Sequence, residues 1–320
     1  MKKYIGHQGQ ISGVDEVMLT KGKGKGMTLL QVRNGIGLEI TFSADRAMDI
    51  LRVTLKGDNL GYFSSCGYVA PSFYDNRGVG FLKSFTAGFM TTCGLTAVGS
   101  PCTDNGEELP LHGTIANTPC ENYSYCETEN EIIVKAEVRD AAIFAHQLIL
   151  KREYRISKAE NKVSLCDKIK NISSDETPLE VLYHCNIGYP LLSENTVLDI
   201  PSIKTEPRNE HAKDGLADCL KMEKPQQGYE EMCYYHTLKH GRVSAYNPDI
   251  DKRVTISFDT SELPYFVEWK MMGEYDYVLG LEPGNCLPDG RDIMRKNGML
   301  KFLKPNEEKI HHIEFNFMEE

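Results

Sequence analysis

The amino-acid sequence predicts an all-β protein, built as a large two-sheet antiparallel β-sandwich. Three observations favour this fold class: short runs of alternating hydrophobicity rich in β-branched residues, polar turns between those runs, and very little helical periodicity. No linker rich in Pro, Gly or Ser and no internal repeat divides the 320 residues. We therefore expect a single domain over residues 1–320, with two sheets packed on one core.

The predicted strands follow one another along most of the chain. Residues 29–33 and 38–42 flank Asn34-Gly35, a dipeptide typical of a hairpin turn. Further strands are expected at residues 131–138, 146–156, 162–172, 179–187, 241–246, 253–258, 265–271, 277–281 and 309–318.

Two segments do not follow this pattern. Residues 210–220 carry the best helical signal, which Asn209 can cap, but Gly215 and a polar composition limit the helix to one or two turns. Residues 62–108 are rich in Gly, Ser and aromatic side chains without clear periodicity. They predict long loops and short strands over one face of the sheets, where binding often occurs.

Composition excludes several classes of function. A net charge of -10 and a pI near 5.5 disfavour nucleic-acid binding. No basic leader and no apolar run of about 18 residues is present, which indicates a soluble, cytoplasmic protein without membrane contact. The ten cysteines are dispersed and include no C-x-x-C pair, so free thiols are expected rather than disulfides or a zinc site.

Three ionisable side chains lie at positions where packing alone does not readily explain a charged or polar group. His112 lies between a proline-bearing turn and Gly113, and a turn-capping histidine is the alternative. In the apolar run 181–187, alternation places His184 and Asn186 on one face, which indicates a hydrogen-bonded surface, although a satisfied core histidine is also possible. Glu282 ends an apolar strand, where a carboxylate is costly unless it is paired, used or solvated.

In this order, these residues resemble the galactose mutarotase-like superfamily, and more closely its aldose 1-epimerase-like branch of unknown function. The resemblance spans most of the chain and is carried by Asp45-Arg46-Ala47-Met48-Asp49-Ile50, Phe81-Leu82-Lys83-Ser84-Phe85, Thr92-Cys93-Gly94-Leu95, Leu111-His112-Gly113, His184-Cys185-Asn186, Trp269-Lys270-Met271 and Leu281-Glu282-Pro283.

The resemblance implies a role for each matching residue. Glu282 matches the general base and His184 the general acid of anomer exchange, a reaction that needs no cofactor. His112 matches a histidine that contacts the sugar near its ring oxygen, and Arg46 matches an arginine that binds sugar hydroxyls. Asn186 is expected beside the acid as a further substrate contact.

The strand 265–271 is expected to supply one more sugar contact. Alternation puts Trp269 and Lys270 on opposite faces, and we expect the charged Lys270 to point into the site with Trp269 packed beneath it. An aldose 1-epimerase acting on a monosaccharide is therefore the leading interpretation. A non-catalytic sugar-binding protein, or a carbohydrate lyase or isomerase on the same fold, remains an alternative. The identity of the sugar, its phosphorylation and the oligomeric state (monomer or homodimer) stay open.

Overall fold

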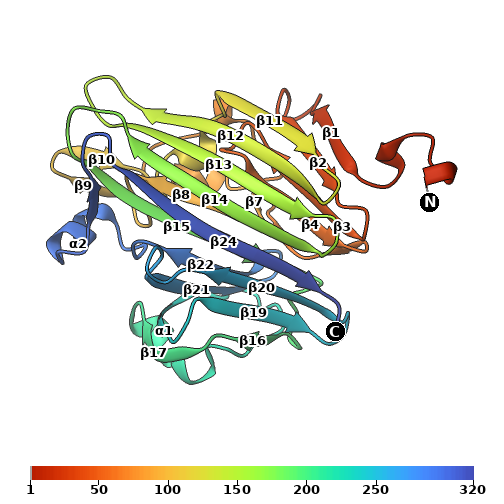
Figure 1. The fold of residues 1–320 in the computed structure, drawn as a ribbon. Helices are drawn as coiled ribbons and strands as arrows, with labels where there is room; N and C mark the ends of the chain where they lie inside the picture. The colour runs from red at the N-terminus through yellow and green to blue at the C-terminus, as the bar shows by residue number, and fades with distance from the viewer. Residues whose placement is uncertain (1) are drawn as a thin grey trace.

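Two large antiparallel β-sheets lie face to face in the computed structural model, which describes residues 2–320 (Figure 1). The first sheet has twelve strands. Ten of them run in the spatial order β1 (Gly13–Met18), β2 (Thr28–Arg33), β3 (Leu38–Ser43), β4 (Asp49–Leu55), β8 (Met90–Leu95), β15 (Thr177–Ile187), β22 (Tyr277–Gly284), β21 (Tyr265–Met272), β18 (Met232–Leu238) and β17 (Ser202–Pro207). The other two extend it, with β5 (Asp58–Asn59) on β4 and β23 (Lys301–Leu303) on β15.

The second sheet has eight strands and lies in front of the first in Figure 1. Its spatial order is β11 (Asn122–Glu127), β12 (Glu131–Ala141), β13 (Gln147–Ser157), β14 (Lys162–Asn171), β24 (Glu308–Met318), β20 (Lys252–Phe258), β19 (Arg242–Asn247) and β16 (Val197–Asp199). Two short pairs complete the strands: β6 (Tyr62–Phe63) with β7 (Ala87–Gly88), and β9 (Cys102–Asp104) with β10 (Glu107–Leu109). The predicted all-β sandwich is confirmed.

Helices are short throughout the described chain. The α-helices are α1 (Glu210–Asp214) and α2 (Arg291–Lys296), and the 3-10 turns are η1 (Lys2–Tyr4), η2 (Gln8–Gln10), η3 (Pro71–Phe73), η4 (Gly80–Lys83), η5 (Ile115–Asn117) and η6 (Leu216–Asp218). Asn209 caps α1 as predicted, because its side chain accepts a hydrogen bond from the Ala212 amide. No helix among residues 2–320 is long and apolar enough to cross a membrane.

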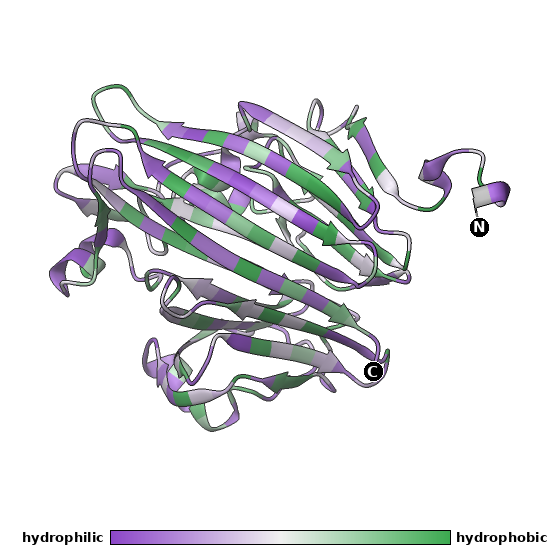
Figure 2. Cartoon of the chain, in the orientation of Figure 1, coloured by the Kyte–Doolittle hydropathy of each residue, from purple (hydrophilic) through white to green (hydrophobic). Residues whose placement is uncertain are grey.

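The core lies between the two sheets. Along β12, Ile132, Val134 and Val138 are buried while Lys135 and Arg139 are exposed, and Figure 2 shows this alternation on the long strands in front. From the opposite sheet, β15 adds the side chains at positions 183, 185 and 187 to the same core. The other face of β15 must therefore point away from the core, toward whatever covers the first sheet.

A buried ionic network ties the two sheets together inside this core. The Arg152 guanidinium of β13 lies 2.8 Å from Asp49 of β4 and 2.6 Å from Asp167 of β14. Arg152 also donates to the Thr92 hydroxyl of β8, and Tyr183 of β15 donates to Asp167 at 2.8 Å. Because every partner is buried, removing the central guanidinium would strand two carboxylates without compensation.

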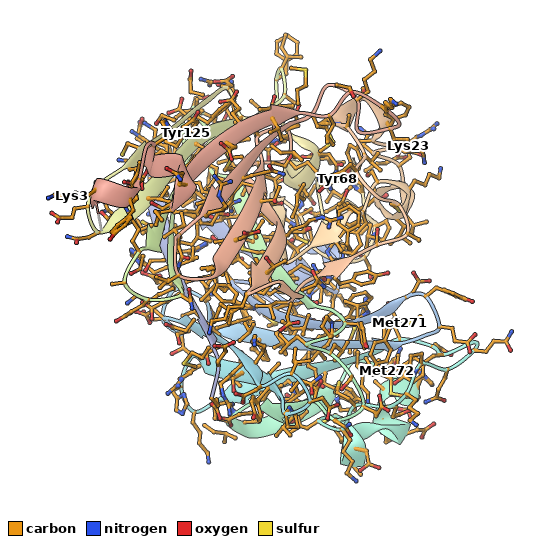
Figure 3. The ribbon with its side chains drawn as sticks, turned by 90° about the vertical axis from the view of Figure 1, so that its right-hand side faces the viewer. Lys3, Lys23, Tyr68, Tyr125, Met271 and Met272 are labelled. Carbon is orange, nitrogen blue, oxygen red and sulfur yellow. The ribbon has the colours of Figure 1, made fainter. Side chains whose placement is uncertain are left out.

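Two covering segments, residues 61–88 and 96–117, fold over the outer face of the first sheet. Phe81, Phe85 and Ala116 form a small apolar cluster there, and the Phe85 ring lies 5.5 Å from the His184 ring of β15. Figure 3, turned by 90° from Figure 1, shows Tyr68 of the first covering segment and Tyr125 of β11 toward opposite sides of the molecule. The expected loops over one face are confirmed, except that residues 90–95 form the central strand β8.

Candidate active site

A cavity of about 300 Å³ opens on the outer face of the first sheet, beneath the covering segments. Strands β15, β18, β21 and β22 form its floor, and turns of the covering segments form its walls. Its lining residues are Val79, Phe81, Leu82, Phe85, Gly99, Ser100, Pro101, Leu111, His112, His184, Arg208, Glu231, Cys233, Val267, Trp269, Glu282 and Pro288. All three predicted acid-base residues line this one cavity.

Strand register brings His184 and Glu282 together, although 98 positions separate them in the chain. Strands β15 and β22 pair at Leu182–Gly284 and at Cys185–Leu281, which sets His184 opposite Glu282. Directly paired residues of antiparallel strands share a face, so both side chains leave the sheet on its outer side. The His184 Nε2 atom lies 3.2 Å from Glu282 Oε1.

Burial drives both groups of this pair toward their neutral forms. It raises the pKa of the Glu282 carboxyl well above its usual range, and the nearby Glu231 carboxylate adds to this rise. It lowers the pKa of His184 to about 4. The 3.2 Å contact does not have hydrogen-bond geometry, so Glu282 Oε1 and also His184 Nδ1 are without a hydrogen-bond partner within the described chain. Buried polar atoms of this kind require a partner, which a polar ligand in the cavity can supply.

Room for the Glu282 carboxylate depends on a glycine two residues earlier in β22. A Cβ atom at Gly280 would lie 2.2 Å from Glu282 Oε1 and 3.1 Å from the Trp269 Cβ. Gly280 pairs with Trp269 across β21 and β22, so the absent side chain leaves space between the carboxylate and the indole. The observed position of the Glu282 carboxylate therefore requires glycine at position 280.

A tight turn of the second covering segment holds His112 over the sheet. The residue has a positive φ of 59°, its amide donates to the Gly99 carbonyl, and its carbonyl accepts from the Gly94 amide. Gly113 also has a positive φ, and a Cβ there would meet the Gly94 carbonyl oxygen at 2.3 Å. The two imidazoles of His112 and His184 lie 5.6 Å apart, edge to face. Sequence context had placed this histidine at a turn, and it lies there.

His112 is neutral in this environment. Burial, followed by the positive charges that His184 and Arg208 can carry, lowers its pKa to about 3. Its Nδ1 atom is buried and has no partner among the described residues. A neutral imidazole with a free ring nitrogen can donate or accept one hydrogen bond to a ligand hydroxyl.

Trp269, and not Lys270, points into the cavity, which corrects the expectation for this strand. The indole packs edge-on against the His184 ring at 5.2 Å, and its Nε1 donates to Glu231 at 2.7 Å. Lys270 lies on the opposite face, where its ammonium donates to the Lys221 carbonyl at 2.5 Å and contacts Glu223. The alternation was predicted correctly. The prediction from the charge of Lys270 was wrong, because backbone carbonyls on the opposite face of the sheet accept hydrogen bonds from its ammonium group.

Arg46 does not line the cavity either. Arg46 is only 1% exposed, and its guanidinium donates to the Asn117 side chain at 2.9 Å and to the Val69 carbonyl. Burial lowers its pKa to about 10, so it holds the covering segments onto the sheet as a structural cation. Asn186 shares a face with His184 as predicted, but it is fully buried and donates to the His184 carbonyl rather than lining the cavity.

Two charged lining residues were missed in the sequence. Arg208 follows β17, and its backbone amide donates to the Cys233 carbonyl of β18. Glu231 immediately precedes β18 and reaches Trp269. Both stand in irregular segments, and their chain positions gave no signal of convergence on the pair. Within residues 2–320, no group of three or more metal-ligating side chains is placed to hold a metal ion.

Comparison with known proteins gives the family and the fold. The family model described as "Domain of unknown function (DUF4432)" matches residues 24–317. A proposed aldose 1-epimerase from Klebsiella pneumoniae is 27% identical, with 96% of this chain and 83% of that chain covered and a TM-score of 0.89. No curated protein sequence matches.

Two more distant structures share the fold alone. One is a galactose mutarotase-like protein from Clostridium acetobutylicum, with 14% identity, 97% and 100% coverage and a TM-score of 0.71. The other is a galactose 1-epimerase from Lactobacillus acidophilus, with 13% identity, 96% and 99% coverage and a TM-score of 0.64. The fold is that of galactose mutarotase-like proteins, as the sequence predicted.

Proposed function

The chain belongs to the DUF4432 family of unknown function, and from that premise we propose that it is an aldose 1-epimerase, which interconverts the α and β anomers of a monosaccharide. One observation carries the proposal: a carboxyl and an imidazole on neighbouring strands lie 3.2 Å apart in a cavity with an indole and a second histidine. The reaction needs one base and one acid at the hemiacetal, and the aromatic side chains offer surfaces for a sugar face.

The proposed reaction conserves protons within the pair. Glu282, as the carboxylate, removes the proton of the C1 hydroxyl while His184, as the imidazolium, protonates the ring oxygen. The bond between C1 and the ring oxygen breaks, and the open-chain aldehyde rotates about C1–C2. Glu282 then returns its proton to the carbonyl oxygen, His184 takes the proton of the attacking hydroxyl, and the ring closes with inverted C1.

The electrostatics of the cavity support this cycle. Burial favours a protonated Glu282 and a neutral His184, and this is the form the pair takes while the open-chain sugar is bound. The ion-pair form that opens the ring contains the same number of protons and differs by one transfer between the two side chains. Polar hydroxyls of a bound sugar stabilise the ion pair, because they can hydrogen-bond to the unpartnered atoms Glu282 Oε1 and His184 Nδ1. His112 supplies a further neutral contact for a sugar oxygen.

Replacing Glu282 by Gln tests the proposal. The substitution keeps shape and hydrogen-bonding capacity but removes the proton acceptor, so acceleration of anomer exchange should fall by about 10²–10⁴-fold. The measurement is two-dimensional exchange NMR on a panel of aldoses at anomeric equilibrium. Glu129→Gln, at an exposed turn residue, is the matched control and should retain wild-type rates.

A lack of acceleration by the wild-type protein with every aldose would refute the epimerase assignment. If sugars still bound, the protein would be a sugar-binding protein. An unsaturated or ketose product would instead identify a lyase or an isomerase that uses the same carboxylate.

A further inference from the structure

One wall of the cavity is apolar and open at its mouth. Val79 and Leu82, on either side of the start of η4, line the cavity and are 59% and 54% exposed. Phe81 and Leu111 continue this wall inward. Exposed aliphatic side chains that line a binding cavity indicate an occupant with apolar surface at that place, since water is the only other partner for them.

The charged lining residues limit what the rest of the occupant can be. The Arg208 guanidinium donates to the Ser100 hydroxyl at 2.8 Å and to the Pro288 carbonyl, and its Nε lies 3.6 Å from Asp289. Its Nη1 atom has only a weak contact, 3.9 Å from the Cys233 sulfur. The charge of Arg208 is therefore partly neutralised already, while Nη1 keeps donors free for a ligand oxygen.

Glu231 complements this donor with an acceptor. Its Oε2 atom takes the hydrogen bond of the Trp269 indole, and its second oxygen has no partner among the described side chains. Both Arg208 and Glu231 act on the pKa of Glu282 through space, in opposite directions, so these two charges and the Glu282 carboxyl share one region of the cavity. A free donor beside a free acceptor suits hydroxyl groups, each of which can accept from Arg208 or donate to Glu231.

The same charges disfavour an anionic ligand. No Lys and no second Arg lines the cavity within residues 2–320, whereas the Glu231 carboxylate does, and Asp289 contacts Arg208. A phosphate would bring about two negative charges next to carboxylates with one guanidinium to offset them. An uncharged sugar avoids this repulsion.

We propose that the substrate is an uncharged 6-deoxyaldose, whose ring hydroxyls bind Arg208 and Glu231 and whose exocyclic methyl group packs on Val79 and Leu82. A ring CH₂ group would be flanked by hydroxyls on its neighbours, so a wall of two aliphatic side chains suits the exocyclic methyl better. The hydroxymethyl group of the parent hexose would place a hydroxyl against this wall without a partner, which lowers its relative rate. The inference rests on the proposed function for its kinetic readout but not for its binding readout.

The test compares matched sugars that differ by one oxygen: D-fucose with D-galactose, and L-rhamnose with L-mannose, each with D-galactose 6-phosphate as the anionic probe. Exchange NMR gives relative kcat/KM for anomer exchange, and saturation-transfer NMR on the same samples gives binding. We expect the deoxy sugar of at least one pair to be preferred by about 10- to 100-fold, and the phosphate to show neither exchange nor binding.

Substitutions at Val79 and Leu82 test whether the apolar wall causes the preference for the deoxy sugar. Val79→Thr keeps the shape of the side chain but replaces one methyl group by a hydroxyl, and Leu82→Asn likewise replaces methyl groups by a polar amide. Each should move the deoxy-to-parent ratio toward one. Val197→Thr makes the same change at a residue of β16 that is 57% exposed and remote from the cavity, and it should leave the ratio unchanged.

The outcomes separate the two proposals. A parent hexose or the phosphate preferred in both readouts would overturn the deoxyaldose assignment while leaving the epimerase intact. Selective binding of a deoxy sugar without any acceleration would overturn the epimerase and support the ligand class. A preference that survives in both wall variants would also overturn the assignment, because the methyl group would then lie elsewhere.

Discussion

Adding one methyl group at Gly280 should slow the proposed reaction without altering any group that takes part in it. The new Cβ would lie 2.2 Å from Glu282 Oε1, whereas ordinary contacts begin near 3.4 Å, so the carboxylate must move by about 1 Å. A misplacement of this size costs about 10²-fold in rate, which corresponds to about 2.7 kcal/mol of transition-state stabilisation. The backbone at Gly280 lies outside the left-handed region, so alanine introduces no φ strain there.

The assay is anomer exchange by NMR, run beside urea unfolding. Overpacking at this site should cost about 1–3 kcal/mol in the free energy of unfolding, which leaves the chain folded in buffer. Gly6→Ala is the matched control, because a Cβ there meets nothing closer than 3.6 Å. Full activity of a folded Gly280→Ala variant would refute the reasoning, since the position of the Glu282 carboxylate would then be irrelevant to the reaction.

Three further outcomes follow from the described contacts. The value of kcat/KM should fall as the pH drops through about 4, because His184 then becomes an imidazolium beside an already protonated Glu282. It should fall again at high pH as Glu282 ionises. An acid limb at the ordinary histidine pKa near 6.5 would contradict the burial of the pair. Arg46→Met should lower the free energy of unfolding by about 3 kcal/mol in urea titrations yet leave KM unchanged, and a raised KM with intact stability would restore Arg46 to the sugar site. Arg152→Met should destabilise the protein by about 3–5 kcal/mol, because Asp49 and Asp167 lose their shared cation. A cost below about 1 kcal/mol would contradict a role of this ion-pair network in stability.

The strands were predicted best where one face meets the core and the other meets water, although β4 and β18, which also alternate, were not predicted. Along β12, β13 and β24 the alternation is regular, and the predicted ranges match those strands closely. Strand β8 was missed because all six of its residues are buried, on one side by the core and on the other by the covering segments. A strand with two buried faces has no alternation to read. Helix α2 was also missed, as six residues are too few for a periodic signal.

The acid-base side chains could be proposed from the sequence because each is costly in its local context. A carboxylate at the end of the apolar run before Pro283 and a histidine inside an apolar strand both require an explanation beyond packing. The pocket partners Arg208 and Glu231 carry no such local cost, since charged residues in irregular segments are ordinarily solvated. Only the pairing of β17, β18 and β21 brings them next to the acid-base pair.

The cavity wall at η4 and the cavity floor formed by paired strands differ in how readily their residues can be exchanged. His184 and Glu282 are fixed by a hydrogen-bonded ladder that tolerates few changes, whereas Val79 and Leu82 occupy a short surface turn. Exchange of a few turn residues can therefore change which ligand the cavity accepts without disturbing the pairing of β15 with β22.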